Sequence, residues 1–186
     1  MCPDIPHGMK QILFLMICGL LLVSEAQCAE NTAAQTTEAF LNGAFLDACP
    51  EPDYIWITKS LQPEVKKILN HDYQGIRIKY WKLQKQTAWV LSEIVKNKRI
   101  TVGIAIKQSK IENVKILFNP DHRSRQMTYS SFTDQFKGIA SDDQYGLTKN
   151  IDAISGATMS SVAVAKLAQL ALFLDHHVDQ KMRDDN

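Results

Sequence analysis

The sequence is poor in glycine and proline and carries almost no net charge. Its 186 residues include only 8 glycines and 6 prolines, and no Pro/Gly/Ser-rich linker divides the chain into separate domains. Hydrophobic residues make up 45% of the chain and the formal net charge is +1, which excludes disorder for most of it. The balanced charge also excludes nucleic acid as an expected partner, because that binding depends on clustered cations. The composition predicts one globular domain.

Only one stretch of the chain is continuously apolar. It covers residues 12–23, follows Lys10 and ends shortly before Ala26. A membrane-spanning helix needs roughly 20 apolar residues, so the shorter run predicts a cleavable secretory signal at residues 1–26, with an uncleaved membrane anchor as the alternative. Either form places the domain in a periplasmic or other extracytoplasmic compartment.

Cysteine is scarce as well. Removal of residues 1–26 leaves two of the four cysteines, Cys28 and Cys49. Two cysteines without Cys-x-x-Cys or His-rich spacing form no disulfide framework and no metal site. A Cys28–Cys49 bridge in an oxidising compartment stays open, and the alternative is that Cys49 is a small packed or half-exposed residue. The hydrophobic core is therefore expected to hold the domain together.

Four β-rich runs follow one another in the middle of the chain, at 76–83, 87–95, 99–107 and 111–118. The polar connections between them are too short for a crossover helix, so neighbouring strands must be antiparallel. A shorter β-rich run precedes them at 54–58. Helices are expected at 36–46, after an N-cap at Ser60, at 129–136 and at about 158–178. The predicted fold class is α+β, an antiparallel β meander covered by helices that include a long C-terminal helix.

The segment that enters the last predicted helix is rich in small hydroxyl residues. It runs from Asp152 to Ser161 with the sequence Asp-Ala-Ile-Ser-Gly-Ala-Thr-Met-Ser-Ser. A helix N-terminus presents unpaired N–H groups and the positive end of the helix dipole, which together suit a phosphate. On spacing alone a simpler interpretation stays open, in which Ser155 or Thr158 is only the N-cap of an apolar helix.

The pattern Asp-x-x-Ser-Gly-Ala-Thr-x-Ser resembles the flavinylation motif of the FMN-binding domain family, known in subunits of the sodium-pumping NADH:quinone reductase and of the related Rnf complex. The resemblance implies that FMN is joined covalently, by a phosphoester bond, to Thr158. It also implies that a dedicated flavin transferase delivers this FMN from FAD. The similar region runs from about Arg99 to Leu174 and includes a Gln135-Phe136 helix. The implied organisation after the signal is a polar segment with a short helix, an FMN-binding domain and a polar tail, at 27–50, 51–180 and 181–186.

The predicted cofactor site centres on this motif. Thr158 must be exposed to attack the FAD pyrophosphate, and Gly156 and Ala157 leave room for the close approach. The resulting phosphodiester keeps one negative charge, which can be stabilised by the helix N-terminus and by the hydroxyls of Ser155, Ser160 or Ser161. By resemblance, Asp152 belongs to the recognised signature and orients the hydroxyl or contacts the transferase. Its alternative role is that of a turn residue bonding its own backbone.

Contacts to the flavin ring are less defined by the sequence. A basic loop holds His122, Arg123 and Arg125, and cations near the ring would favour the anionic reduced flavin. A solvated basic loop is the alternative, because the larger pump subunits tend to carry Glu-Thr-Pro-Gly in this loop and this chain does not. An aromatic wall for the ring has three candidates, for which core or cross-strand packing is the preferred interpretation: Trp56, Trp81 and Trp89.

The motif has no catalytic apparatus beside it in the sequence, since no nucleophile with a base, no paired carboxylates and no metal ligands adjoin it. This favours an electron carrier over a stand-alone enzyme. The expected function is that of an extracytoplasmic electron-transfer flavoprotein whose partners are the flavin transferase and membrane or periplasmic redox proteins. The alternative is a flavin-bearing sensory or assembly module of a membrane redox complex.

Overall fold

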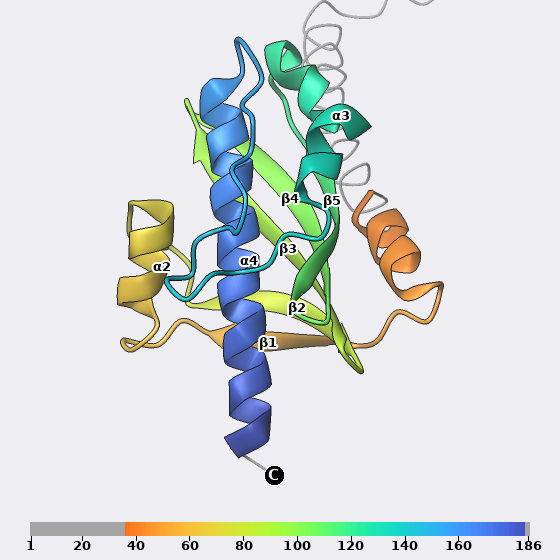
Figure 1. Ribbon diagram of the computed structural model, residues 1–186, viewed down its shortest axis with the longest axis vertical. Coiled ribbons are helices and arrows are strands. Elements are labelled where there is room, and N and C mark those ends of the chain that lie inside the picture. The colour runs from red at the N-terminus through yellow and green to blue at the C-terminus, as the bar shows by residue number, and fades with distance from the viewer. Residues whose placement is uncertain (1–35, 185–186) are drawn as a thin grey trace, which may run out of the picture. The chain divides into compact units, whose positions relative to one another are not determined.

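Five antiparallel strands form one sheet in which spatial order follows the chain (Figure 1): β1 (Pro52–Trp56), β2 (Arg77–Leu83), β3 (Gln86–Val95), β4 (Lys98–Lys107) and β5 (Lys110–Phe118). The computed structural model describes residues 36–184, without the side chains of 122–124 and 184. Two-residue turns join β2 to β3, β3 to β4 and β4 to β5, and each has at least one residue with positive φ, as the twist of tight hairpins requires. The predicted four-stranded meander is confirmed, and the short run before it adds a fifth strand that lies two residues earlier than expected.

The long helix α4 (Thr158–Asp184) lies across one face of the sheet, with α2 (Gln62–Leu69) beside it (Figure 1). Its apolar residues are nearly continuous from Val162 to Leu174, and the six consecutive residues 170–175 are all buried, so this part of the helix is covered on more than one side. They pack on the residues that point to this face of β4, among them Val102 and Ile104, both 0% exposed. The predicted α+β class and the long C-terminal helix are confirmed, and the helix continues past the expected end at about residue 178.

Helix α4 is also the one helix of the described residues that is long and apolar enough to cross a membrane. However, 67% of its most apolar stretch is buried inside the domain. The core helix of a globular protein passes the same test of length and composition, and packing on the sheet accounts for the apolar residues of α4.

Helical residues 36–45 cover the opposite face of the sheet. Phe40, 2% exposed, packs over β4 at Gly103, where an added Cβ would lie 2.8 Å from the phenyl ring. A glycine inside a strand often marks such a close approach. Trp81 and Ala105 belong to the same cluster. The helix itself was expected, whereas its place as the cover of a second sheet face was not.

Two helix predictions are corrected. Ser60 is not the N-cap of α2, because the helix begins after Leu61 and the Ser60 hydroxyl hydrogen-bonds the Thr58 hydroxyl at 2.7 Å. The expected helix at 129–136 is split into α3 (Ser130–Thr133) and a 3₁₀ turn, and a second 3₁₀ helix, η1 (His122–Thr128), precedes it. The packing of three buried side chains overrides the local helical pattern here: Met127, Phe132 and Phe136.

Two predictions concern residues outside the described part of the chain. The signal at 1–26 lies there, and so does Cys28. Cys49 is exposed. The Cys28–Cys49 bridge therefore stays a prediction.

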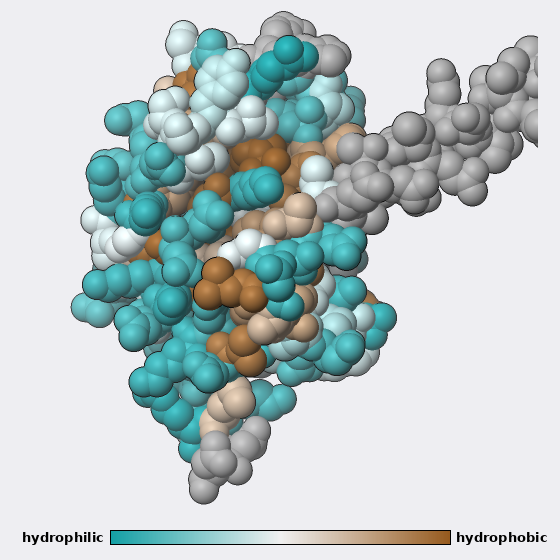
Figure 2. Space-filling view, turned by 90° about the vertical axis from the view of Figure 1, so that its right-hand side faces the viewer, coloured by the Kyte–Doolittle hydropathy of each residue, from teal (hydrophilic) through white to brown (hydrophobic). Residues whose placement is uncertain are grey.

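The surface carries hydrophobic side chains in small groups. On the face drawn in Figure 2 these groups lie among hydrophilic residues, and the exposed large hydrophobic residues are spread from Leu46 to Met182. Small patches of this kind are usual on globular domains. Most of the apolar side chains are thus buried between the sheet and its two helical covers.

Candidate functional site

The predicted motif forms a tight turn that leads directly into α4. Thr158 is the first residue of the helix and is exposed, as are Ser155 and Gly156 before it. Gly156 has a φ of +78°, a conformation that a residue with a Cβ adopts only at a cost of about 1 kcal/mol or more. Glycine at this position lets the chain turn sharply just before the helix, which leaves Thr158 at the surface.

Ser161 holds this turn together from inside the helix. Its hydroxyl accepts a hydrogen bond from the Ile154 N–H at 3.1 Å and donates one to the Ala157 carbonyl at 3.2 Å. The Ala157 N–H donates in turn to the Ile154 carbonyl at 3.0 Å. Ser161 is only 2% exposed, so it acts as a positioning residue for the turn. A contact between Ser161 and a phosphate stays a prediction.

Neither Ser155 nor Thr158, the two N-cap residues of the simpler interpretation, caps the start of α4 with its side chain. Within residues 36–184, no hydrogen bond is found for the side chain of Ser155 or Thr158. The first helical bond joins the Ser161 N–H to the Ala157 carbonyl at 2.9 Å. The amides of the three residues between them therefore have no acceptor inside the helix, and they add to the positive end of its dipole. This helix end can hydrogen-bond an anion.

Gln135 fastens the beginning of the motif to the segment that follows α3. The Asp152 N–H donates to the Gln135 Oε1 at 2.8 Å, and the Gln135 Nε2 donates back to the Asp152 carbonyl at 3.4 Å. The Asp152 carboxylate is exposed and makes no hydrogen bond to another described residue. The structure therefore does not show the turn in which Asp152 bonds its own backbone. The backbone of Asp152 shapes the motif, while its side chain is accessible to another molecule.

A cavity of about 170 Å³ opens beside the first turn of α4. Residues 156–160 form one wall, and the other wall comes from the β3–β4 hairpin and from the segment that follows β5. Clefts that hold drug-sized ligands measure roughly 300–1,000 Å³. The cavity is thus too small for a whole flavin and matches a smaller group such as a phosphate.

Two lysines on the far wall were missed by the sequence analysis. Lys96 lies in the β3–β4 turn and Lys98 is the first residue of β4, and both line the cavity together with Asp121. The Lys98 Nζ lies 3.4 Å from the Asp121 Oδ1. In the sequence, Lys-Asn-Lys looks like an ordinary solvated turn, and its nearness to the motif depends on how α4 packs on the sheet.

The residues predicted to surround the flavin ring are only partly placed. The basic loop forms η1, and of its three cations only the side chain of Arg125 is described; it is exposed and does not line the cavity. The tuning role of His122, Arg123 and Arg125 stays a prediction.

The tryptophans do not line the cavity either. Trp89 and Trp81 are 0% and 7% exposed and belong to the two core clusters, in agreement with the preferred interpretation. Trp56 is 56% exposed and lies beside the Arg77 guanidinium. The apolar residues that do line the cavity are Val95, Ile100, Ala157 and Met159.

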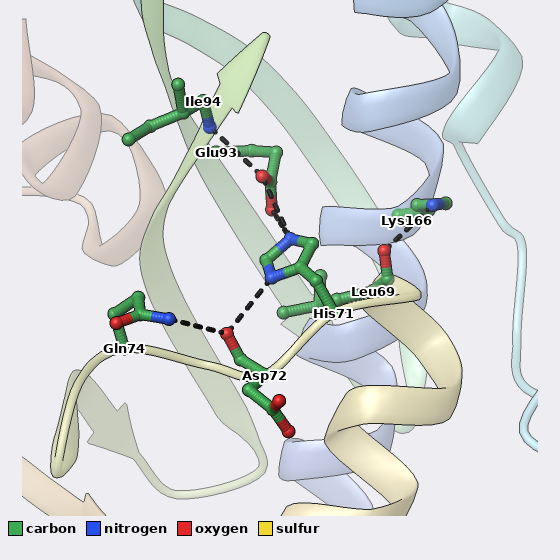
Figure 3. Close-up of polar contacts among 7 residues, drawn as sticks. All are labelled: Leu69, His71, Asp72, Gln74, Glu93, Ile94 and Lys166. Carbon is green, nitrogen blue, oxygen red and sulfur yellow. Dashed lines mark hydrogen bonds and ion pairs between the residues drawn. The ribbon is translucent and has the colours of Figure 1, made fainter. Parts of the chain in front are cut away.

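A separate polar cluster joins the end of α2 to β3 (Figure 3). The His71 Nε2 lies 3.0 and 3.1 Å from the two Glu93 carboxylate oxygens, and the Lys166 Nζ of α4 donates to the Leu69 carbonyl at 2.8 Å. The bond to the Asp72 carbonyl raises the pKa of His71, and Glu93 adds to this effect. The cluster joins α2, β3 and α4. In the described part of the chain, no group of three His, Cys, Asp or Glu residues could hold a metal ion.

Comparison with known protein families agrees with the resemblance carried by the motif. Residues 96–172 match the model of the FMN-binding domain. The match begins in the β3–β4 turn and includes β4, β5, α3, the motif and the first half of α4. It covers less than half of the chain. A search of curated proteins found no match.

Proposed function

We propose, from the match of residues 96–172 to the model of the FMN-binding domain, that this protein is an extracytoplasmic electron-transfer flavoprotein with FMN joined covalently to Thr158. The match indicates a flavin-binding protein. The covalent bond, the electron transfer and the location outside the cytoplasm are the proposed parts. The proposed partners are a flavin transferase and membrane or periplasmic redox proteins.

The observation that carries the proposal is the exposed Thr158 at the first position of α4, beside a cavity of phosphate size. A modifying enzyme must bring the Thr158 oxygen to the pyrophosphate of FAD, so the residue has to be accessible. Gly156 contributes to this access, since no atom lies within 4 Å of the place that a Cβ would take. An ordinary core helix has no need of such an open first turn.

The proposed transfer is a substitution at phosphorus. The Thr158 Oγ1 forms a bond to the FMN phosphorus of FAD, the pyrophosphate bond breaks, AMP leaves, and the hydroxyl proton is released. The transferase is proposed to supply the catalytic groups. The protein itself contributes the presentation of Thr158 through the turn held by Ser161 and Gln135.

The small cavity also supports electron transfer over catalysis on a small molecule. Its volume of about 170 Å³ suits the phosphate end of FMN, so the isoalloxazine ring is proposed to lie outside it and to be accessible to redox partners. When bound, FMN supplies one- and two-electron chemistry. The residues of this chain hold the phosphate end and leave the ring open to partner proteins.

Intact-mass measurement of protein made with its flavin transferase and FAD tests the proposal. The wild type is expected to gain the mass of one FMN less one water and to stay yellow after denaturation. Thr158→Ala is expected to lose both properties and to stay folded, because the side chain is exposed. Ser130→Ala, a matched loss of an exposed hydroxyl outside the motif, should keep the adduct. A wild type without an adduct, or an adduct that persists in Thr158→Ala, would contradict the proposal.

Variants of Gln135 and Asp152 distinguish the positioning of the motif from its recognition by the transferase. Gln135→Ala is expected to lower the free energy of unfolding by about 1 kcal/mol, because both bonds to the Asp152 backbone are lost. Asp152→Ala is expected to change it by less than about 0.5 kcal/mol, because its carboxylate is exposed and makes no bond within the described residues. Both variants should be loaded with flavin more slowly. Chemical denaturation and mass-spectrometric time courses measure the two effects. Normal loading of Asp152→Ala would show that the carboxylate is not recognised.

A further inference from the structure

The β3–β4 turn brings two cations to the wall of the cavity opposite Thr158. Lys96 and Lys98 are both exposed and both line this cavity. Lys96 and Asn97 have φ values of +49° and +64°, the conformation of a tight two-residue hairpin turn. The backbone at the base of each lysine is thereby held in place by the sheet, although the match of residues 96–172 to the family assigns no role to either residue.

Among the described side chains that line the cavity, the charges are not balanced. Two ammonium groups, Lys96 and Lys98, face one carboxylate, Asp121, which lies 3.4 Å from the Lys98 Nζ. No ion pair is found for Lys96 within residues 36–184. The positive end of the α4 dipole adds to the excess of positive charge. A monoanion in the cavity would neutralise this excess.

Ser160 provides a second, independent sign of a ligand on the helix side. It is 6% exposed and lines the cavity, yet its hydroxyl makes no hydrogen bond to the described residues. Every fully covered side-chain oxygen or nitrogen of these residues has a partner. The Ser160 oxygen is therefore not fully covered, and because the residue lines the cavity, its hydroxyl is available to an acceptor there.

We propose that the β3–β4 turn is the second half of the phosphate site, in which Lys96 and Lys98 bind the phosphodiester that joins FMN to Thr158. Ser160 and the first amides of α4 bind the same group from the opposite wall. This inference rests on the proposed function, because the anion reaches the cavity only by attachment to Thr158. It adds a specific consequence: flavin loading links the β3–β4 turn to α4.

Loading is therefore expected to stabilise the domain. In the unloaded protein, Lys98 pairs with Asp121, and Lys96 has no ion pair within the described residues. In the loaded protein, both lysines face a negative charge, and charge-assisted hydrogen bonds are the stronger kind. For a chain of this size we expect the melting temperature to rise by about 2 to 4 °C on loading. The rise should shrink at high salt, because the groups are exposed and the Debye length falls to about 3 Å at 1 M salt.

The test compares melting temperatures of unloaded and fully loaded protein, with loading followed by intact mass. In Lys96→Gln/Lys98→Gln, the rise on loading and its dependence on salt should largely disappear. Lys96→Arg/Lys98→Arg keeps the charges and should restore both. The matched control is Lys85→Gln, an exposed lysine in the two-residue turn at the other end of β3, which should behave as the wild type does.

The outcomes separate this inference from the proposed function. An adduct on Thr158 combined with equal melting-temperature rises in the wild type and in the Gln double variant would overturn the role of the lysines and leave covalent loading intact. Absence of the adduct in the wild type would overturn both. As a second readout, the ³¹P resonance of the loaded protein should shift in the Gln double variant and keep its position in the Lys85→Gln control. An unchanged resonance in all three proteins would also count against the lysines.

Discussion

Replacement of Trp89 by alanine is expected to lower the free energy of unfolding by about 3 to 5 kcal/mol, the range for removal of a fully buried aromatic side chain. Trp89 is 0% exposed, and its ring stacks on Tyr80 with 4.8 Å between the ring centroids and 16° between the ring planes. Its Nε1–H donates to the Thr87 Oγ1 at 3.0 Å. The substitution leaves a cavity between the sheet and α4 and removes this hydrogen bond. Urea unfolding followed by far-ultraviolet circular dichroism measures the change.

Two further variants show whether burial is the cause. Trp89→Phe keeps an aromatic ring on Tyr80 and should be less destabilising than Trp89→Ala. Trp56→Ala removes a tryptophan that is 56% exposed, so the loss should be much smaller. Because Trp89 does not line the cavity beside Thr158, Trp89→Phe should be loaded with flavin at the wild-type rate. Slow loading of a stable Trp89→Phe variant would point to a role in the flavin site.

Substitution of Asp175 by asparagine is expected to stabilise the protein at neutral pH and to have little effect near pH 4. Asp175 lies in the C-terminal half of α4, is 4% exposed and accepts a hydrogen bond of 2.6 Å from the Thr87 Oγ1. Burial raises the pKa of this carboxyl from 3.8 to about 6, and Asp179 adds to the rise, whereas the Thr87 bond and the nearby Lys82 and His176 oppose it. Asparagine retains an acceptor for Thr87 and carries no charge.

The direction of the pH effect follows from proton binding. Between about pH 4 and pH 6 the folded protein keeps a proton on Asp175 that the unfolded chain releases. The contribution of Asp175 to stability therefore falls as the pH rises through this window, and the full penalty is present above about pH 6. A pKa difference of this size corresponds to about 3 kcal/mol, which is the upper limit of the gain in Asp175→Asn.

Urea unfolding of the wild type and Asp175→Asn between pH 4 and pH 8 tests this expectation. The difference in free energy of unfolding should grow between pH 4 and pH 6 and then stay constant. Asp134→Asn replaces an exposed carboxylate and should run parallel to the wild type. A constant difference between the wild type and Asp175→Asn at all pH values would mean that Asp175 keeps an ordinary pKa in the folded protein.

Much of the local structure was determined by the sequence alone. Short turns allow only antiparallel pairing, and the alternation of Val102, Ile104 and Ile106 in β4 defines the face that α4 covers, so the meander and the α+β class were predictable. The motif was also predictable, because all of its residues are neighbours in the chain. Its helix start, its glycine and its threonine follow one another directly, and the exposure of Thr158 depends on the turn that these residues form.

Contacts between distant segments were decided only by the tertiary structure. Lys96 and Lys98 line the same cavity as Thr158, which comes about sixty positions later in the chain, because α4 begins beside the β3–β4 turn. The bond between Gln135 and the Asp152 backbone and the packing of Phe40 on Gly103 arise in the same way. Such contacts depend on strand register and on where a helix crosses the sheet, and neither is recorded in the periodicity of a single segment.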